Sequence, residues 1–166
     1  MRRKMDIYHI KDEYINFIKE YDSSVPDNKH ESRPYIGVIL EIDETKYYAP
    51  FTSPKAKHQS MHNAKDFRKI EGGRLGAINF NNMIPVPDEA IIPICINDEE
   101  NIQYRRLLQN QYRAISQDWS VIQATAERLH TLIFTPDTDL SPNDKKIKER
   151  CCNLPLLESI YKNWML

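Results

Sequence analysis

The chain has 166 residues, of which 40% are hydrophobic and 28% are charged, and its formal net charge at pH 7 is −1. This length and composition exclude an intrinsically disordered chain and predict one globular domain spanning residues 1–166. The longest apolar runs, 35–40 and 90–96, are far shorter than the roughly 20 residues that a membrane-spanning helix needs.

The first half of the chain is predicted to consist mainly of strands. Residues 5–10 form a strand candidate, and apolar side chains then recur at helical spacing over 14–21, with Asp12 as the expected N-cap. Residues 22–32 are polar and should form a loop. β-Branched and aromatic runs at 35–42 and 45–51, separated by two polar residues, predict a hairpin.

The strand pattern continues beyond the first hairpin. The runs 67–70 and 75–80 flank Gly72-Gly73, which is a second hairpin signal. Short apolar runs interrupted by prolines, which suit edge or terminal strands, follow at 83–86 and 91–96.

The second half is predicted to be helical. Helical patterns occupy the ranges 97–115, 119–134, 141 onward and 154–164. Asn97 or Asp98 could cap the first of these helices, and Ser141 followed by a proline is a strong start signal for the third. Strands followed by helices predict an α+β fold with a largely antiparallel, strongly curved sheet.

Positive charge is concentrated in one stretch, residues 52–70. It contains one acid, Asp66, against five cations, Lys55, Lys57, Lys65, Arg68 and Lys69. A nearly neutral protein with such a stretch can present a positive face to a polyanion. The alternative is a solvated charged loop, but the interleaved hydroxyls and histidines favour the first interpretation.

The start of this stretch has the residue types of a phosphate site. A strand predicted to end at Phe51 delivers Thr52, Ser53 and Lys55 onto a loop that Pro50 and Pro54 stiffen. A phosphate there could accept hydrogen bonds from the hydroxyls and a charge-assisted one from the lysine. Taken alone, the run Thr-Ser-Pro-Lys at 52–55 is a weak signal, and a plain surface turn is the favoured explanation of it.

Two longer motifs give a resemblance to a known family. The run 50–55 (Pro-Phe-Thr-Ser-Pro-Lys), followed by Lys57-His58, and the run 75–86 (Leu-Gly-Ala-Ile-Asn-Phe-Asn-Asn-Met-Ile-Pro-Val) resemble the ToxN/AbiQ/CptN toxins of type III toxin–antitoxin systems. The likeness also includes an N-terminal pattern made of Tyr8, Tyr14-Ile15, Tyr21-Asp22, Val25-Pro26 and residues 33–37.

The resemblance implies a fold and an activity. It implies a compact SH3-like β-barrel core, similar to other bacterial toxin nucleases, decorated by helices that are concentrated in the C-terminal half. It also implies a metal-independent endoribonuclease that needs no cofactor and cleaves cellular or phage RNA to 2′,3′-cyclic phosphate ends. Such a toxin acts in the bacterial cytoplasm, in growth arrest and abortive infection against phage. A small antitoxin RNA of pseudoknot repeats, which the toxin processes, inhibits it within a closed protein–RNA assembly.

The family's active-site motif matches Thr52, Ser53 and Lys55, which we therefore expect to be catalytic. Lys55 would neutralise the charge that develops on the phosphate, and it could also transfer a proton if it were buried. Ser53 would orient the phosphate or the 2′-hydroxyl without forming a covalent intermediate. Thr52 would hold the loop or donate a further hydrogen bond.

A wider set of residues is expected to bind RNA. Tyr14 and Arg33 match positions that bear on activity in the family, although Tyr14 could equally be a core residue on its helix. The expected RNA-binding residues are Tyr14, Arg33, Lys57, His58, Lys65, Arg68 and Lys69.

No metal site is expected. His58 and His62 are four residues apart, but no third ligand is apparent, and His58 could instead donate a proton or make a structural hydrogen bond. The three cysteines, Cys95, Cys151 and Cys152, lack ligand spacing and should be buried, inert thiols. Their odd number, and a basic N-terminus that reaches Asp6 before any apolar segment, suit a cytosolic protein.

Two other functions remain open at this stage. The chain could be a noncatalytic RNA-binding barrel, or a barrel toxin that inhibits a protein target. Fold class alone does not separate these functions from an endoribonuclease. The first would bind RNA without cutting it, and the second would not bind RNA.

Overall fold

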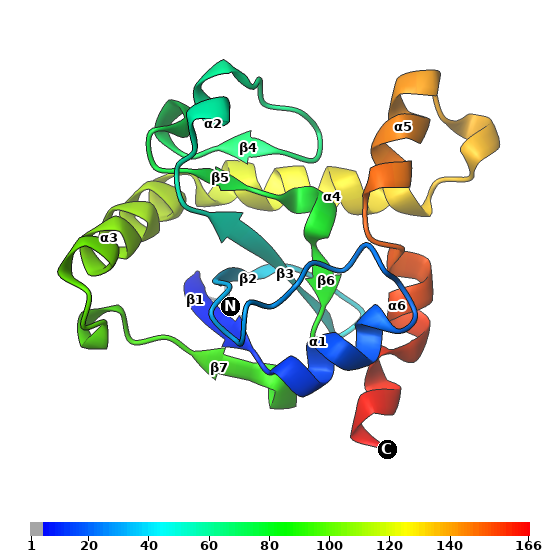
Figure 1. Ribbon diagram of the computed structural model, residues 1–166. Coiled ribbons are helices and arrows are strands. Elements are labelled where there is room, and N and C mark those ends of the chain that lie inside the picture. Colours follow the sequence, from blue (N-terminus) through cyan, green and yellow to red (C-terminus); the bar gives the residue numbers. More distant parts are fainter. Residues whose placement is uncertain (1–4) are drawn as a thin grey trace.

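A computed structural model describes residues 5–166, which form an antiparallel sheet flanked by helices (Figure 1). The strands are β1 (Asp6–Ile10), β2 (Tyr35–Ile42), β3 (Thr45–Thr52), β4 (Arg68–Lys69), β5 (Ala77–Ile78), β6 (Ile84–Pro85) and β7 (Ile91–Pro93). The α-helices are α1 (Asp12–Lys19), α2 (Ala56–Ser60), α3 (Ile102–Gln117), α4 (Trp119–Phe134), α5 (Pro142–Arg150) and α6 (Leu154–Ile160). The predicted α+β class, with most helices in the second half, is confirmed.

The β2–β3 hairpin is the centre of the sheet. Its turn residues, Asp43 and Glu44, both have positive φ (49° and 70°), as a tight hairpin turn with right-handed strand twist requires. The buried faces of the two strands carry large side chains, among them Tyr47, Tyr48 and Phe51. The hairpin predicted from the sequence is therefore confirmed, and its second strand ends at Thr52.

Strand β3 has different neighbours along its length. Its first half pairs with β6, through Tyr47 and Tyr48, whereas its end pairs with β5 through Phe51 and Thr52. Strand β5 also pairs with β4, which confirms the second predicted hairpin in a shorter form. Pairing with β5 thus holds the end of β3 in place at Thr52, the residue at which the basic stretch begins.

The sheet is open, so the closed SH3-like barrel implied by the resemblance is not formed. Its strand order is β4-β5-β3-β2-β1-β7, with β6 beside β3, and within residues 5–166 the edge strands β4 and β7 are not paired with each other. Both edges are too short to close a barrel, since β4 has two residues and β7 has three. Pro93 in β7 also lacks the N–H that a further ladder would need.

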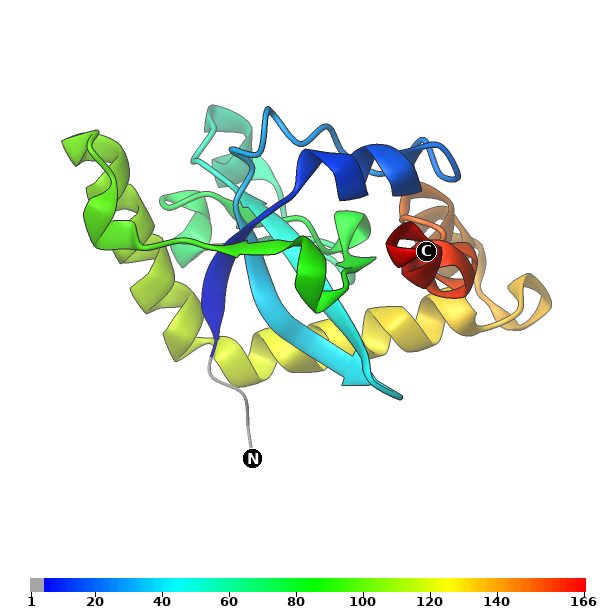
Figure 2. The same cartoon turned by 90° about the horizontal axis from the view of Figure 1, so that it is seen from below.

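Helices cover both sides of the central hairpin. Helix α4 packs against β2, and α1 lies on the opposite side of the hairpin, close to the C-terminal turn (Figure 2). Helix α6 contacts both α4 and β6. Strands and helices share one hydrophobic core that extends from Met5 to Tyr161. Within residues 5–166, no helix has the length and apolar character needed to cross a membrane.

Several helix boundaries differ from the sequence-based expectation. Lys11, rather than Asp12, is the N-cap of α1, because Asp12 Oδ1 instead accepts hydrogen bonds from Asn28 Nδ2 and the Glu31 N–H. The N-cap of helix α3 is Asn101, three or four residues later than the predicted caps Asp98 and Asn97. The cap at Ser141 is confirmed, since its hydroxyl accepts from the Asp144 N–H. The short helix α2 was not predicted.

Candidate active site

The TSPK segment (residues 52–55) connects the end of β3 to the start of α2. Thr52 is the last residue of β3, and Lys55 is the N-cap of α2. Ser53 and Lys55 are exposed, whereas Thr52 is partly buried. The segment therefore presents one hydroxyl and one ammonium group to solvent at a position that strand pairing fixes.

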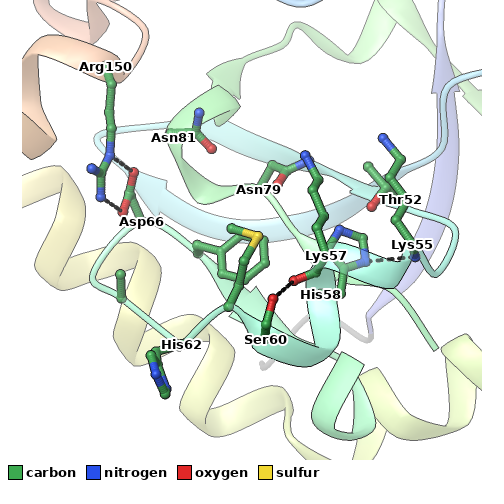
Figure 3. A pocket seen from close by; sticks show the side chains of 13 residues that line it. Thr52, Lys55, Lys57, His58, Ser60, His62, Asp66, Asn79, Asn81 and Arg150 are labelled. Carbon is green, nitrogen blue, oxygen red and sulfur yellow. Dashed lines mark hydrogen bonds and ion pairs between the residues drawn. The ribbon is translucent and has the colours of Figure 1, made fainter. Parts of the chain in front are cut away.

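Two adjoining hollows meet at the TSPK segment, and both are lined by Thr52 and Lys55. The first has a volume of about 470 Å³ and is bounded by Lys57, His58 and Arg150 (Figure 3). The second has a volume of about 360 Å³, and its lining includes Ser53, Arg33, Tyr104 and Gln111. A chain laid across the segment could occupy both hollows.

The Thr52 hydroxyl oxygen is buried and has no hydrogen-bond partner within residues 5–166. A buried polar group without a partner costs about 1–3 kcal/mol. Such groups are rare in folded proteins, and each one calls for an explanation. Asn28, Tyr35 and Tyr47 also have one such atom each, but only the Thr52 hydroxyl belongs to the TSPK segment. Thr52 sits between the two hollows, so a phosphate oxygen bound there could become its partner after a small adjustment.

His58 fixes the other end of the TSPK segment. It is only 2% exposed, and its Nδ1 accepts a hydrogen bond from the Lys55 N–H at 3.1 Å. An accepting Nδ1 carries no proton, so the neutral ring holds its proton on Nε2. Burial, with the cations of Lys57 and Lys55 nearby, lowers the pKa of His58 below 6.5. The geometry therefore favours a structural hydrogen bond for His58 over proton donation or contact with RNA.

An ion pair that the sequence did not reveal borders the first hollow. Arg150 donates from Nε and from Nη2 to the two carboxylate oxygens of Asp66, at 2.6 and 2.7 Å (Figure 3). The Asp66 side chain is 4% exposed and that of Arg150 is 52% exposed. Asp66, the lone acid of the basic stretch, is therefore a buried anchor for α5. Its position next to Phe67 was the only local signal of burial.

Two of the expected RNA-binding cations lie beside the TSPK segment. Lys57 is exposed on α2 and lines the first hollow. Arg33 lines the second hollow, and its Nε donates to the Asp27 carbonyl at 2.7 Å. The structure therefore brings these two residues and His58 together with Thr52, Ser53 and Lys55.

The other expected RNA-binding cations lie outside both hollows. Lys65 pairs with Asp144 at 2.8 Å, and Arg68 pairs with Asp118 at 3.1 Å. Lys69 lies in β4, where its backbone N–H donates to Asn63 Oδ1. These three cations lie around the site rather than within it.

Tyr14 lies in the core and not on the surface that borders the TSPK segment, so the structure does not place it among the expected RNA contacts. The residue is fully buried, its hydroxyl donates to the Pro85 carbonyl, and its ring packs edge-on against Trp164. Burial raises the pKa of Tyr14 well above its usual value of 10. The alternative, a core tyrosine on the apolar face of α1, is what the structure contains.

The histidines and cysteines do not gather into a metal centre. His62 is exposed, whereas His58 is buried with its Nδ1 engaged. Within residues 5–166, no three His, Cys, Asp or Glu side chains are placed to share a metal ion. Cys151 and Cys152 are buried, and burial raises the pKa of each thiol to about 12. Cys95 is exposed, contrary to expectation, because it lies in the irregular segment after β7.

Comparison with known proteins relates this geometry to a family. Residues 6–162 match the family described as "Toxin ToxN, type III toxin-antitoxin system". The chain is 35% identical, over 154 residues, to endoribonuclease ToxN of Bacillus thuringiensis subsp. kurstaki. That alignment covers 90% of this chain and 78% of the relative.

Solved structures give a similar result. The chain matches a bacterial type III toxin that a non-coding RNA pseudoknot selectively inhibits, with a TM-score of 0.86, 28% identity and coverage of 98% and 99% of the two chains. It also matches a protein of a bacterial antiviral system that a processed non-coding RNA regulates. That match has a TM-score of 0.78 and 27% identity, and it covers 95% and 98% of the two chains.

Proposed function

The chain belongs to the ToxN family of type III toxin–antitoxin toxins, and from this premise we propose that it is an endoribonuclease that cleaves RNA at the TSPK segment. The observation that carries the proposal is the placement of Ser53 and Lys55 at the junction of two hollows, on a backbone fixed by strand pairing. We also propose that residues 1–166 act as one domain, which is supported by the single hydrophobic core that the described residues share.

The proposed reaction is an intramolecular transesterification, in which the phosphoryl group of the RNA is transferred from the 5′-oxygen to the 2′-oxygen. The 2′-oxygen, as it loses its proton, forms a bond to the adjacent phosphorus, while the bond from phosphorus to the 5′-oxygen breaks. The departing 5′-oxygen takes up a proton. The products are a 2′,3′-cyclic phosphate and a 5′-hydroxyl, and the step requires neither a metal ion nor a covalent enzyme intermediate.

The side chains of the segment suit the charge that this reaction develops. The phosphate becomes more negative in the transition state, and donors fixed in advance around it lower the barrier. Lys55 supplies the positive charge, and the Ser53 hydroxyl orients the phosphate or the 2′-hydroxyl. Thr52 supplies a further donor, which regains a hydrogen-bond partner when the phosphate binds. Lys55 is exposed, so its position supports charge neutralisation more than proton transfer.

The proposed partners are RNA molecules. The substrate is cellular or phage RNA, and the inhibitor is a small antitoxin RNA of pseudoknot repeats that the toxin also processes. The likeness to a toxin inhibited by an RNA pseudoknot supports this pairing. Arg33 and Lys57 flank the segment and would contact the RNA backbone. The proposed location, where such RNAs occur, is the bacterial cytoplasm.

The proposal is tested by incubating the purified, RNA-free protein with a defined RNA in excess chelator. Wild type and Ser53→Ala are compared, and the 3′ ends of the products are analysed by mass. We expect cyclic-phosphate ends from the wild type and intact RNA from the variant. Intact RNA from a folded wild type that still binds RNA would favour a noncatalytic RNA-binding protein. Loss of both binding and cleavage would favour a toxin with a protein target.

A further inference from the structure

Helix α3 carries one polar side chain in the middle of its buried face. Leu108 and Ile115 are 2% and 1% exposed, and Gln111, which lies between them at helical spacing, is 2% exposed. Burying an amide is unfavourable unless hydrogen bonds replace those it makes with water. A glutamine between buried leucine and isoleucine positions of the helix is a signal in the sequence that the prediction of the site did not use.

The Gln111 amide bridges two backbone segments. Its Nε2 donates to the Leu75 carbonyl at 2.9 Å and to the Thr52 carbonyl at 3.3 Å. Leu75 lies in the chain that links the 3₁₀ turn Glu71–Gly73 to β5, and Thr52 opens the TSPK segment. One side chain of α3 therefore ties the start of the segment to the neighbouring turn.

Glycines bring that turn against the segment. Gly76 has a φ of +102°, and a Cβ at this position would lie 1.8 Å from the Thr52 carbonyl oxygen. Gly73 has a φ of +94°, and a Cβ there would lie 2.8 Å from the carbonyl oxygen of His58. Any other residue would push the two chains apart, so the turn packs directly against both the TSPK segment and α2.

The Thr52 carbonyl is part of the peptide plane that continues to the Ser53 nitrogen. Because that plane is rigid, fixing the carbonyl oxygen also fixes the direction in which the chain enters Ser53. Gln111 thereby acts on Ser53 without contacting it. His58, at the Lys55 N–H, fixes the far end of the same segment.

We propose that Gln111 is a positioning residue for RNA cleavage, holding the Thr52–Ser53 peptide in the orientation that the reaction needs. The inference rests on the proposed endoribonuclease function of the TSPK segment. Exposed cations such as Lys57 lie on other elements, so loss of the Gln111 amide impairs the reaction step while RNA binding is retained. A misplacement of about 1 Å can lower a reaction rate by about 100-fold.

The test is Gln111→Met, which keeps the length of the side chain and removes both hydrogen-bond donors. Gln109→Met is the matched control on the same helix, since Gln109 Nε2 donates to Asn97 Oδ1 at 3.4 Å and the residue lies outside both hollows. Single-turnover cleavage at saturating protein gives the reaction rate, and titration of the RNA gives the dissociation constant. Circular dichroism and thermal melts establish that each variant is folded.

We expect Gln111→Met to lower the saturated cleavage rate by about 10- to 100-fold while the dissociation constant changes by less than about threefold. Gln109→Met should match the wild type. An unchanged saturated rate, or a loss confined to RNA affinity, would overturn the proposal. If Gln111→Met does not fold, Gln111→Asn decides, because the shorter amide cannot reach both carbonyls. A rate equal to wild type in that variant would likewise overturn it.

Failure of the proposed function would look different. In that case the wild type would not cleave RNA, or Ser53→Ala would cleave as well as the wild type. Failure of the Gln111 inference alone leaves an active wild type, an inactive Ser53→Ala and a fully active Gln111→Met.

Discussion

The TSPK segment and the cations around it are held in place in different ways. The segment is fixed through its backbone by Gln111 and His58, both 2% exposed. The cationic rim, which we define as Lys65, Arg68 and Lys69, lies at the periphery. Two of its members make ion pairs in which at least one partner is largely exposed: Lys65 is 58% exposed, and Asp118, the partner of Arg68, is 49% exposed.

This difference separates two requirements of RNA cleavage. Buried hydrogen bonds are costly to break, so they suit groups that must keep one geometry at the reacting phosphate. Exposed ion pairs contribute only about 0–1 kcal/mol, so their cations can exchange a carboxylate for an RNA phosphate at little cost. If the proposed function holds, we expect the segment to serve the reaction and the rim to serve RNA binding. Four predictions test this division, from the largest expected effect to the smallest.

Lys55→Met should have the largest effect. It removes the exposed ammonium of the TSPK segment while the backbone contacts to His58 and Gln111 remain. Loss of one fixed donor to a developing negative charge typically lowers a rate by about 10²–10³-fold. The saturated single-turnover cleavage rate should fall by that factor, and the melting temperature should stay near that of the wild type. A loss below about threefold would remove Lys55 from the reaction step.

Arg150→Met should cause the largest loss of stability. The Asp66 carboxylate, 4% exposed, would remain buried without its bidentate partner. Because Arg150 is half exposed, we expect a loss of about 2 kcal/mol rather than the value for a fully buried pair. Urea unfolding measures it, with Lys65→Met as the surface comparison. Equal losses for the two variants would contradict the distinction between buried and exposed pairs.

The hydrogen bond from the Lys55 N–H to His58 Nδ1 predicts that the free energy of unfolding depends on pH. Since burial lowers the pKa of His58 in the folded protein, the unfolded chain binds a proton first as the pH falls. The stabilisation from the neutral ring is therefore complete above about pH 6.5 and is lost progressively below it. His58→Asn keeps a hydrogen-bond acceptor but cannot titrate.

Urea unfolding of wild type and His58→Asn at about pH 7.5 and 5.5 measures this linkage. At the higher pH we expect the variant to be less stable by about 1 kcal/mol, the usual effect of a weakened cap. At the lower pH the difference should shrink, because only the wild type loses stability through this group. A difference that is the same at both pH values would show that His58 does not titrate as described.

Lys65→Met should have the smallest effect. Loss of the exposed pair with Asp144 should change the unfolding free energy by less than about 0.5 kcal/mol. If Lys65 contacts an RNA phosphate, the variant should bind RNA several-fold more weakly, and the slope of log affinity against log salt should fall by about 1. An unchanged affinity and slope would exclude Lys65 from the RNA contact surface.

The sequence predicted those features that depend on local pattern. The β-branched and aromatic runs and the polar pair Asp43-Glu44 were sufficient for the central hairpin. The end of β3 was predicted one residue early, at Phe51, so Ser53 lies on the connecting loop as expected whereas Thr52 is still part of the strand. The open sheet could not be predicted in this way, because closure depends on which distant edges meet. Strands as short as β4 have no pattern that reveals their partner.

The unpredicted site residues depend on contacts between distant parts of the chain. Gln111 reaches Thr52 across 59 positions, and Arg150 reaches Asp66 across 84. Tyr14 has an aromatic ring that could stack on an RNA base. Only its hydrogen bond to the Pro85 carbonyl and its ring contact with Trp164 assign it to the core. Long-range packing thus decided which of the plausible residues stand at the site.

The most direct test of the account replaces one atom of the substrate. An RNA whose cleavage site has been mapped is compared with the same RNA carrying a single 2′-deoxy nucleotide on the 5′ side of the scissile phosphate. We expect cleavage at that position to stop while binding is unchanged, because the 2′-oxygen is the proposed nucleophile. Continued cleavage of the deoxy substrate at that position would mean that water attacks the phosphate, and would contradict the proposed role of the segment.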